Sequence, residues 1–356
     1  MKSNRIPLPN GTKLSTHLTI TQLLSNAGQT ALTYLATTKD NEHVVVKEMF
    51  PFESDNEYYR DGYQIFVKRK YEKNHEEERR QEREFIKECE NTSLIGAIEN
   101  QEAMIAFVFE DITQEVRKNI EFQGTIARYC IAATIHAKTL HEIMDTQEIS
   151  FTQALVYTRS ILEATDQCHS KEQRVHLDVT CDTILCLGKE NGESIRCALL
   201  DCGSVKKIEE ISVAMPRIET NRYSSKEMRK RNHYSRVGNR ANVIKYTDFL
   251  GFQSDLFSIG TIAFHLITQK TFDEMLWQEI SETESTTKKQ RLIKQALSKV
   301  RNITSPEFLD KLCGIFSRAL YFSPSKEQSS INRYNDCKAF MDDIDHILHS
   351  IENHQI

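Results

Sequence analysis

The 356-residue chain lacks the cysteine spacing of a disulfide framework or of a zinc site. Its nine cysteines are an odd number, and they are scattered along the sequence without a Cys-x-x-Cys pair. Disulfide-rich extracellular domains and structural zinc sites use cysteines that are paired or regularly spaced. The pattern therefore predicts a reduced, cytoplasmic protein that contains neither disulfides nor structural zinc.

Long apolar segments and a strong charge of one sign are also missing. The stretch MKSNRIPLPNGTK at the start has no apolar core of a signal sequence. The longest apolar run, around Leu256–Ile267, is too short and too interrupted to span a bilayer. The net charge is only −5, which argues against a dedicated surface for nucleic acid or membrane. We therefore expect no nucleic-acid partner and no membrane anchor.

The chain has no internal repeat, and its character changes once along its length. Strand-like pieces rich in Val, Thr, Leu and Tyr come first, at residues 18–24, 30–37, 43–50 and 103–112. The charged stretch 68–90 carries a thin apolar stripe and predicts one helix with a solvated face. Helical patterns follow at Ile126–Met144, Phe151–Ser170, Asp255–Thr268, Thr286–Val300, Pro306–Ala319 and Asn335–Ile351.

This order predicts an α+β protein with a small β-rich N-lobe and a larger helical C-lobe. We place the hinge near Glu110–Thr113, where the strand-like patterns give way to helical ones. The expected parts are an N-terminal extension at 1–17, the N-lobe at 18–112, the C-lobe at 113–350 and a tail at 351–356.

Two features of the N-lobe are candidates for binding phosphate. Lys47 ends the strand-like run HVVVK, where its ammonium group needs a partner unless the strand lies at a sheet edge. The turn NAGQTALTYLA keeps one glycine of a G-x-G-x-x-G loop, with Asn26, Gly28 and Ala31 in the three glycine positions. Asparagine tolerates positive φ, so Asn26 still permits a tight turn. An ordinary hairpin explains the same stretch equally well.

Two carboxylates flank a predicted hairpin further along. HLDVTCDTILCL and ALLDCG are short apolar runs on either side of the turn Lys189-Glu190-Asn191-Gly192. Such a hairpin brings Asp178 and Asp201 to its open end. A pair of carboxylates in one cleft suits a metal ligand and a residue that orients a hydroxyl group, while a plain hairpin with solvated ends remains the alternative.

Taken in order, these segments resemble the bacterial branch of the eukaryotic-type Ser/Thr protein kinases. That family has a two-lobed fold with a small β-rich N-lobe and a larger helical C-lobe. The resemblance covers residues 18–350 approximately. It rests on VVVKEMFP at 44–51, HLD at 176–178, DCG at 201–203, YSSKE at 223–227, SDLFSIGTIAFHLIT at 254–268 and Arg333 in NRYNDCKAF.

The resemblance implies an ATP site in the N-lobe. Lys47 would orient the α- and β-phosphates, with Glu88 as its helical partner and Glu84 as the alternative. The other residues that would contact the nucleotide are Asn26, Gly28 and Ala31 in the loop, Phe109 as gatekeeper, and Glu110 and Ile112 in the hinge.

The resemblance also implies a catalytic residue and a metal site. Asp178 would orient the hydroxyl group of a protein substrate and accept its proton. Asp201 would chelate Mg²⁺ or Mn²⁺, and Thr183 stands where a second metal ligand, usually Asn, is expected. Structural support would come from His176 packed under the loop, Asp255 capping its backbone, and a buried ion pair between Glu227 and Arg333.

Residues 201–227 correspond to the activation segment of such kinases. The segment contains Ser204, Ser212, Thr220, Ser224 and Ser225, whose phosphorylation could pair with Arg217 or Arg222. Leu177, however, replaces the arginine that usually receives an activation-segment phosphate. This replacement argues against phosphorylation-dependent activation.

Departures from the family pattern leave two functions open. Thr180 replaces a lysine that lies near the γ-phosphate, and Thr183 replaces the usual asparagine. The first function is ATP-dependent Ser/Thr protein kinase, in which magnesium assists transfer of the γ-phosphoryl group to a protein hydroxyl. The alternative is a pseudokinase, a nucleotide-binding regulatory or scaffold module. A kinase-like enzyme for small molecules fits less well, because an activation segment serves recognition of a protein substrate.

Overall fold

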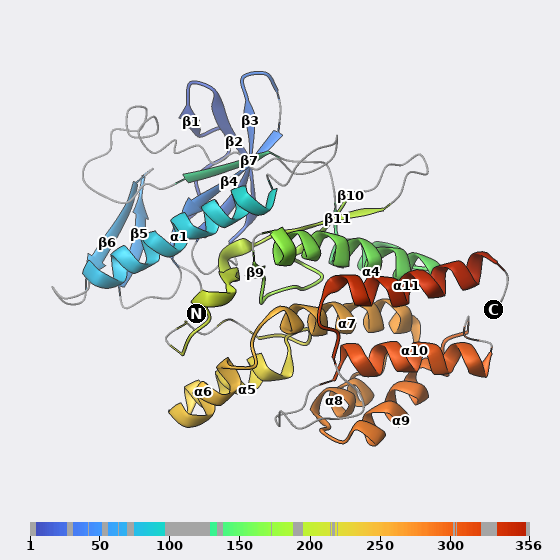
Figure 1. Cartoon of the computed structure of the whole chain (residues 1–356). Helices are drawn as coiled ribbons and strands as arrows, with labels where there is room; N and C mark the ends of the chain where they lie inside the picture. The colour runs from blue at the N-terminus through green and yellow to red at the C-terminus, as the bar shows by residue number, and fades with distance from the viewer. Residues whose placement is uncertain are drawn as a thin grey trace. The chain divides into compact units, whose positions relative to one another are not determined.

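The chain divides into two compact units, Met1–His136 and Ala137–Ile356. Together they form a mixed α+β protein, which confirms the predicted class (Figure 1). The computed structural model describes residues 5–26, 31–41, 43–51, 56–62, 64–69, 75–96, 129–133, 138–171, 173–187, 195–213, 215, 218, 220–301, 303, 305–321 and 333–353.

The first unit is built on a five-stranded antiparallel sheet with the order β1-β2-β3-β4-β7. Its strands are β1 (Lys13–Ser15), β2 (Leu18–Ser25), β3 (Ala31–Thr38), β4 (His43–Met49) and β7 (Tyr129–Ala133). The three strands predicted at 18–24, 30–37 and 43–50 are confirmed. Alternate residues such as Leu32, Tyr34 and Val46 are fully buried, because successive side chains of a strand point to opposite faces of the sheet.

Strand β7 differs from the sequence prediction, which placed a helix over Ile126–Met144. Tyr129–Ala133 pairs instead with β4, in the antiparallel register that sets Lys47 opposite Cys130. The predicted helix is therefore wrong over Tyr129–Ala133 and Lys138–Thr139, which are strands, and the end of the predicted range is helical in α3 (Leu140–Thr146). Short apolar runs cannot be assigned to helix or strand by periodicity alone, and here pairing with a buried strand decides the outcome.

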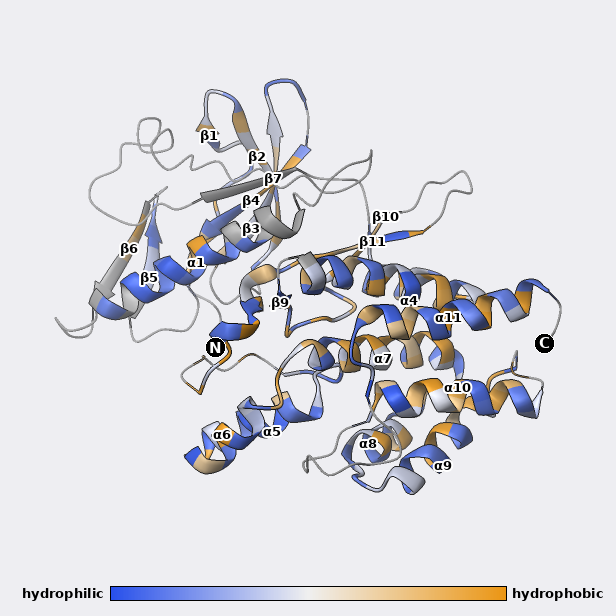
Figure 2. Ribbon diagram, viewed as in Figure 1, coloured by the Kyte–Doolittle hydropathy of each residue, from blue (hydrophilic) through white to orange (hydrophobic). Residues whose placement is uncertain are grey.

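The N-terminal extension and one helix complete the first unit. Leu8 and Leu14 join the core of the sheet, so the stretch predicted as an extension is part of this unit. Helix α1 (His75–Gly96) lies in the charged stretch, is mainly hydrophilic in Figure 2, and packs through Phe85. A hairpin of β5 (Asn56–Asp61) and β6 (Gln64–Arg69) was not predicted.

The second unit is mostly helical and has one large apolar core. Its central helix is α7 (Phe252–Thr268), which is strongly apolar in Figure 2 and packs against α4 (Phe151–Asp166) and α10. The other helices are α5 (Lys226–Arg236), α6 (Arg240–Thr247), α8 (Glu274–Glu282), α9 (Thr286–Leu297), α10 (Pro306–Ala319) and α11 (Cys337–Glu352). The helices predicted from residue 151 onward are confirmed within a few residues.

Short strands carry the segments of interest in this unit. β10 (Ile184–Leu187) and β11 (Arg196–Leu199) form the predicted antiparallel hairpin, and β8 (Lys138–Thr139) adds a third strand to it. β9 (Arg174–Val175) pairs with β12 (Lys206–Lys207). The stretches before Asp178 and after Asp201 are therefore tied together by backbone hydrogen bonds.

Two further sequence expectations concern cysteines and membrane spans. The seven cysteines whose side chains are described are buried free thiols. Among the described helices, no single one is both long and apolar enough to cross a membrane. Taken together, the helical stretches Arg240–Thr247 and Phe252–Thr271 have the length and apolar composition of a membrane span. They are bent by 80° relative to each other, and length and composition are the only grounds for considering them.

Candidate active site

The lysine of strand β4 has the carboxylate partner that a half-buried ammonium group requires. Lys47 Nζ forms an ion pair with Glu88 Oε1 of α1, and the Glu88 side chain is only 7% exposed. Glu84, the alternative partner, lies one turn earlier and pairs with Arg80 at 2.7 Å on the surface. The predicted pairing of Lys47 with Glu88 is therefore confirmed.

The two ends of the candidate phosphate loop are held by an arginine of the N-terminal extension. Arg5 donates hydrogen bonds to the carbonyl oxygens of Asn26, Ala31 (3.4 Å) and Phe50 (2.8 Å). Gly28 lies outside the described residues. The sequence analysis missed Arg5, because nothing in the pattern RIPLP indicates that this side chain folds back onto a loop more than twenty residues away.

A buried polar network next to Lys47 was also missed. Glu48 Oε2 accepts hydrogen bonds from Arg60 Nη2 at 2.5 Å and from the Tyr34 hydroxyl at 2.8 Å. The same hydroxyl accepts the backbone N–H of Leu8 at 3.0 Å, and burial raises the pKa of Tyr34. Arg60 also donates to the carbonyl oxygen of Ile6 at 2.6 Å. Through Tyr34 and Arg60, Glu48 therefore joins the N-terminal extension to the sheet.

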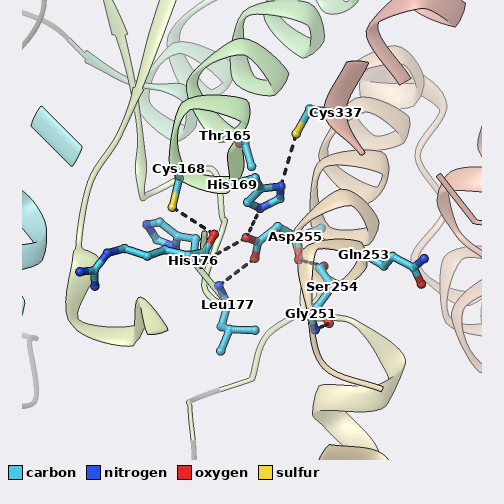
Figure 3. A network of polar contacts seen from close by, with 12 residues as sticks. Thr165, Cys168, His169, His176, Leu177, Gly251, Gln253, Ser254, Asp255 and Cys337 are labelled. Carbon is cyan, nitrogen blue, oxygen red and sulfur yellow. Dashed lines mark hydrogen bonds and ion pairs between the residues drawn. The ribbon is translucent and has the colours of Figure 1, made fainter. Parts of the chain in front are cut away.

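In the second unit, a buried aspartate holds the loop that carries Asp178 (Figure 3). Asp255 is fully buried on α7, and its two oxygens accept the backbone N–H groups of His176 at 2.7 Å and Leu177 at 2.8 Å. His169 Nε2 contacts the same carboxylate at 2.8 Å. Leu177 has φ of 66°, a conformation that a branched residue keeps only when its surroundings impose it. The predicted capping of the loop by Asp255 is confirmed.

His176 connects the two candidate carboxylates. Its Nδ1 accepts the backbone N–H of Asp178 at 3.4 Å, so its Nε2 carries the proton and donates to the carbonyl oxygen of Leu200 at 3.0 Å. Complete burial lowers the pKa of His176, which keeps the ring neutral. Asp201 follows Leu200 directly with φ of 57°, and its side chain is exposed. One neutral imidazole thus fixes the backbone next to both Asp178 and Asp201.

Thr183 uses its hydroxyl group within its own loop. Its Oγ1 donates to the carbonyl oxygen of Asp178 at 2.9 Å and accepts the backbone N–H of Thr180 at 2.9 Å. The Thr180 hydroxyl lies 3.3 Å away, and both threonines are buried. A threonine hydroxyl has one donor and two acceptor positions, and all three are engaged here. The role of Thr183 as a metal ligand stays a prediction, and its contacts favour support of the loop.

The predicted buried ion pair between Glu227 and Arg333 is confirmed. Arg333 Nη1 donates to Glu227 Oε1 at 2.7 Å, and Glu227 is fully buried at the start of α5. The Ser254 hydroxyl donates to the same oxygen at 2.9 Å. The ion pair therefore joins the start of α5 to the stretch before α11, and the Ser254 hydroxyl joins Glu227 to the start of α7.

Other predicted residues are not brought into a described site. Phe109, Glu110 and Ile112 lie outside the described residues, and so does the predicted hinge. Strand β7, which pairs with one edge of β4, begins twenty residues after Phe109. Among the residues that the structure describes, no group of three or more His, Cys, Asp or Glu side chains could hold a metal ion.

No family model matches the chain, and no curated protein matches it.

Proposed function

We propose that this chain is an ATP-dependent protein serine/threonine kinase with the two-lobed fold of that family. The single observation that carries the proposal is the Lys47–Glu88 ion pair, which joins an interior strand to a helix 41 residues later. Protein kinases require such a pair between the lysine that contacts ATP phosphates and a helical glutamate. The anchored loop around Asp178 supports the same function from the second unit.

In this proposal the chain's own residues have distinct tasks. Lys47 binds the α- and β-phosphates of ATP, and Glu88 keeps its ammonium group in position. Asp178 accepts the proton of a serine or threonine hydroxyl, whose oxygen forms a bond to the γ-phosphorus as the bond to ADP breaks. Asp201 would hold a magnesium ion, which would supply positive charge to offset the charge of the phosphates.

The donor set suits a cation that is bound together with nucleotide. Magnesium is commonly held by one or two carboxylates and by substrate phosphates, with water completing its coordination. An exposed Asp201 meets this need without the three-residue cluster that a resident metal ion would require. Phe109, Glu110 and Ile112 remain the predicted contacts for adenine.

A second candidate function, a nucleotide-binding pseudokinase, is favoured by the contacts of two threonines. The hydroxyl group of Thr183 is hydrogen-bonded to the backbone of Asp178 and Thr180. Thr180, which stands where the kinase resemblance expects a phosphate-binding lysine, is only 6% exposed. Loss of one metal ligand and one γ-phosphate contact lowers transfer rates by about 10²- to 10³-fold in enzymes of this kind. The chain would then bind ATP and act through its conformation.

Transfer from labelled ATP separates the two functions. The purified chain is incubated with γ-labelled ATP, Mg²⁺ or Mn²⁺, and dephosphorylated casein, beside Asp201→Ala and Lys47→Met. A kinase gives incorporation that both variants lower by at least about 100-fold. Asp182→Ala, which removes an exposed neighbouring carboxylate, is the matched control and keeps full activity. Equal background in all four proteins overturns the kinase proposal, and a thermal shift with Mg²⁺ and ATP then supports the pseudokinase.

A further inference from the structure

Helix α5 donates hydrogen bonds from two buried side chains to the backbone of the activation segment. Arg231 Nη2 bonds to the carbonyl oxygen of Met215, and Asn232 Nδ2 bonds to that of Ile218. Arg231 and Asn232 are only 1% and 2% exposed. Buried carbonyl oxygens that lose their donors cost about 1 to 3 kcal/mol each, so these bonds strongly favour the observed path of the segment.

The two side chains are themselves held in place. Arg231 Nε donates to the Thr247 hydroxyl of α6 at 3.2 Å, and Arg231 Nη1 donates to Asn232 Oδ1 at 3.3 Å. The Thr247 hydroxyl is bonded in turn to the carbonyl oxygen of Val243 at 2.7 Å. The α5–α6 pair therefore presents both donors in a fixed geometry, at a low entropy cost for each bond formed.

Apolar packing reinforces these hydrogen bonds. Met215 and Ile218 of the activation segment share one buried cluster with Leu177 and with Met228 of α5. Leu177 lies directly before Asp178, at the position where the kinase resemblance would place an arginine for an activation-segment phosphate. A hydrophobic contact thus connects the segment to the catalytic loop, where a charge pair would otherwise form.

The predicted phosphorylation sites fit poorly with a phosphate-dependent mechanism. Ser224 and Ser225 are 6% and 2% exposed, and both are bonded to backbone N–H groups. Arg222, one of two arginines predicted to receive a phosphate, faces Glu274 at 3.5 Å. Arg217 lies outside the described residues. Ser204, Ser212 and Thr220 are left as the accessible hydroxyl groups of the segment.

We infer that Arg231 and Asn232 hold the activation segment in its working conformation without phosphorylation. They are positioning residues, since they act through the backbone of Met215 and Ile218 and not on the reacting atoms. In many kinases a phosphate orders this segment by pairing with arginine. Here α5 and the apolar cluster perform that task from within the chain. The inference rests on the proposed kinase function and describes the regulation of that site.

Hydrogen exchange of the full chain tests the positioning directly. Asn232→Asp keeps the size of the side chain but removes its hydrogen-bond donor. Arg231→Gln shortens the side chain that donates to the carbonyl oxygen of Met215. We expect amides of residues 211–221 to exchange at least about tenfold faster in both variants, with α7 and α10 unchanged as an internal reference for folding. Asn242→Asp and Arg240→Gln, on the neighbouring helix, are the matched controls. Unchanged exchange in residues 211–221 overturns the inference whether or not the chain transfers phosphate.

Kinetics test the second half of the inference. Phosphatase-treated protein and the triple variant Ser204→Ala/Ser212→Ala/Thr220→Ala should keep phosphoryl transfer within about twofold of untreated protein. Asn232→Asp should lower kcat/KM for protein substrate by about tenfold and leave the KM for ATP within about twofold, because the segment faces the protein substrate. Loss of transfer after phosphatase treatment overturns the inference. If no form of the protein transfers phosphate, the proposed kinase function is overturned, but the inference about Arg231 and Asn232 is not. In that case the hydrogen-exchange result decides the inference.

Discussion

At the scale of single residues, the hydroxyl group of Thr183 supports the loop that carries Asp178. A hydroxyl group at this position still reaches the carbonyl oxygen of Asp178, 2.9 Å away, and so fixes the backbone of the candidate catalytic loop. An amide would also have an oxygen left for a metal ion, whereas all the positions of this hydroxyl are engaged. Thr183 therefore supports the loop with every hydrogen-bonding position of its hydroxyl group.

Replacing Thr183 by valine should destabilise the protein. The change preserves side-chain shape but leaves the half-buried carbonyl oxygen of Asp178 without this donor and the buried N–H of Thr180 without this acceptor. We expect the free energy of unfolding to fall by about 1 to 3 kcal/mol, measured by urea denaturation. Thr287→Val, at an exposed helical position, should change it by less than about 0.5 kcal/mol. Equal stability of the two variants would contradict this role for Thr183.

At the scale of elements, helices α7 and α10 approach closely at one glycine. A methyl group built on Gly260 would lie 2.6 Å from Cβ of Ala319, closer than two such atoms can pack. The absence of a side chain at Gly260 therefore permits the helix contact that closes the core of the second unit. Gly314, by contrast, has open space where its Cβ would lie.

Replacement by alanine should have opposite effects on the free energy of unfolding at Gly260 and at Gly314. Gly260→Ala should lower the free energy of unfolding by about 1 to 3 kcal/mol through overpacking. Gly314→Ala should raise it by up to about 1 kcal/mol, because alanine is a better helix former than glycine. Chemical denaturation of both variants checks this. A Gly260→Ala protein as stable as the wild type would show that the helices separate without cost.

At the scale of the whole molecule, buried neutral histidines make stability depend on pH. Burial lowers the pKa of His265 to about 4, and neighbouring Arg222 and His141 act in the same direction. Its Nδ1 lies 3.1 Å from the Tyr223 hydroxyl, a donor whose pKa burial raises. His176 is also held neutral by burial. In both cases the unfolded chain binds the proton more readily than the folded one.

Acid should therefore weaken the fold before most carboxylates titrate. Stabilisation from the neutral His265 is complete above its unfolded pKa, near 6.5, and is lost as the pH falls toward 4. We expect His265 to contribute about 2 kcal/mol to the loss between pH 7 and pH 5. Urea midpoints across this range should fall less steeply in His265→Gln than in wild type. The exposed His349→Gln should follow the wild type, and identical slopes for all three would contradict the assignment.

The sequence predicted the fold best where pattern and pairing agree. Strands β2, β3 and β4 and the helices from residue 151 onward have the expected periods and were placed within a few residues. Strand β7 (Tyr129–Ala133) was not predicted, because it lies inside a stretch with a helical pattern and only hydrogen bonding to β4 shows it to be a strand. The strand predicted at 103–112 lies outside the described residues. The compact units divide at 136/137, whereas the predicted division was at 112/113.

Residue type alone showed that some side chains of the candidate site need a partner, because a lysine on an interior strand is too costly to bury unpaired. The partners themselves, Glu88 for Lys47, the loop backbone for Asp255 and Arg333 for Glu227, were expected from the family resemblance, and the structure shows these contacts. Only the tertiary structure revealed Arg5, Arg231 and Asn232 as donors to distant backbone carbonyls. Every residue presents a carbonyl oxygen, so no pattern along the chain marks which of them will receive such a donor.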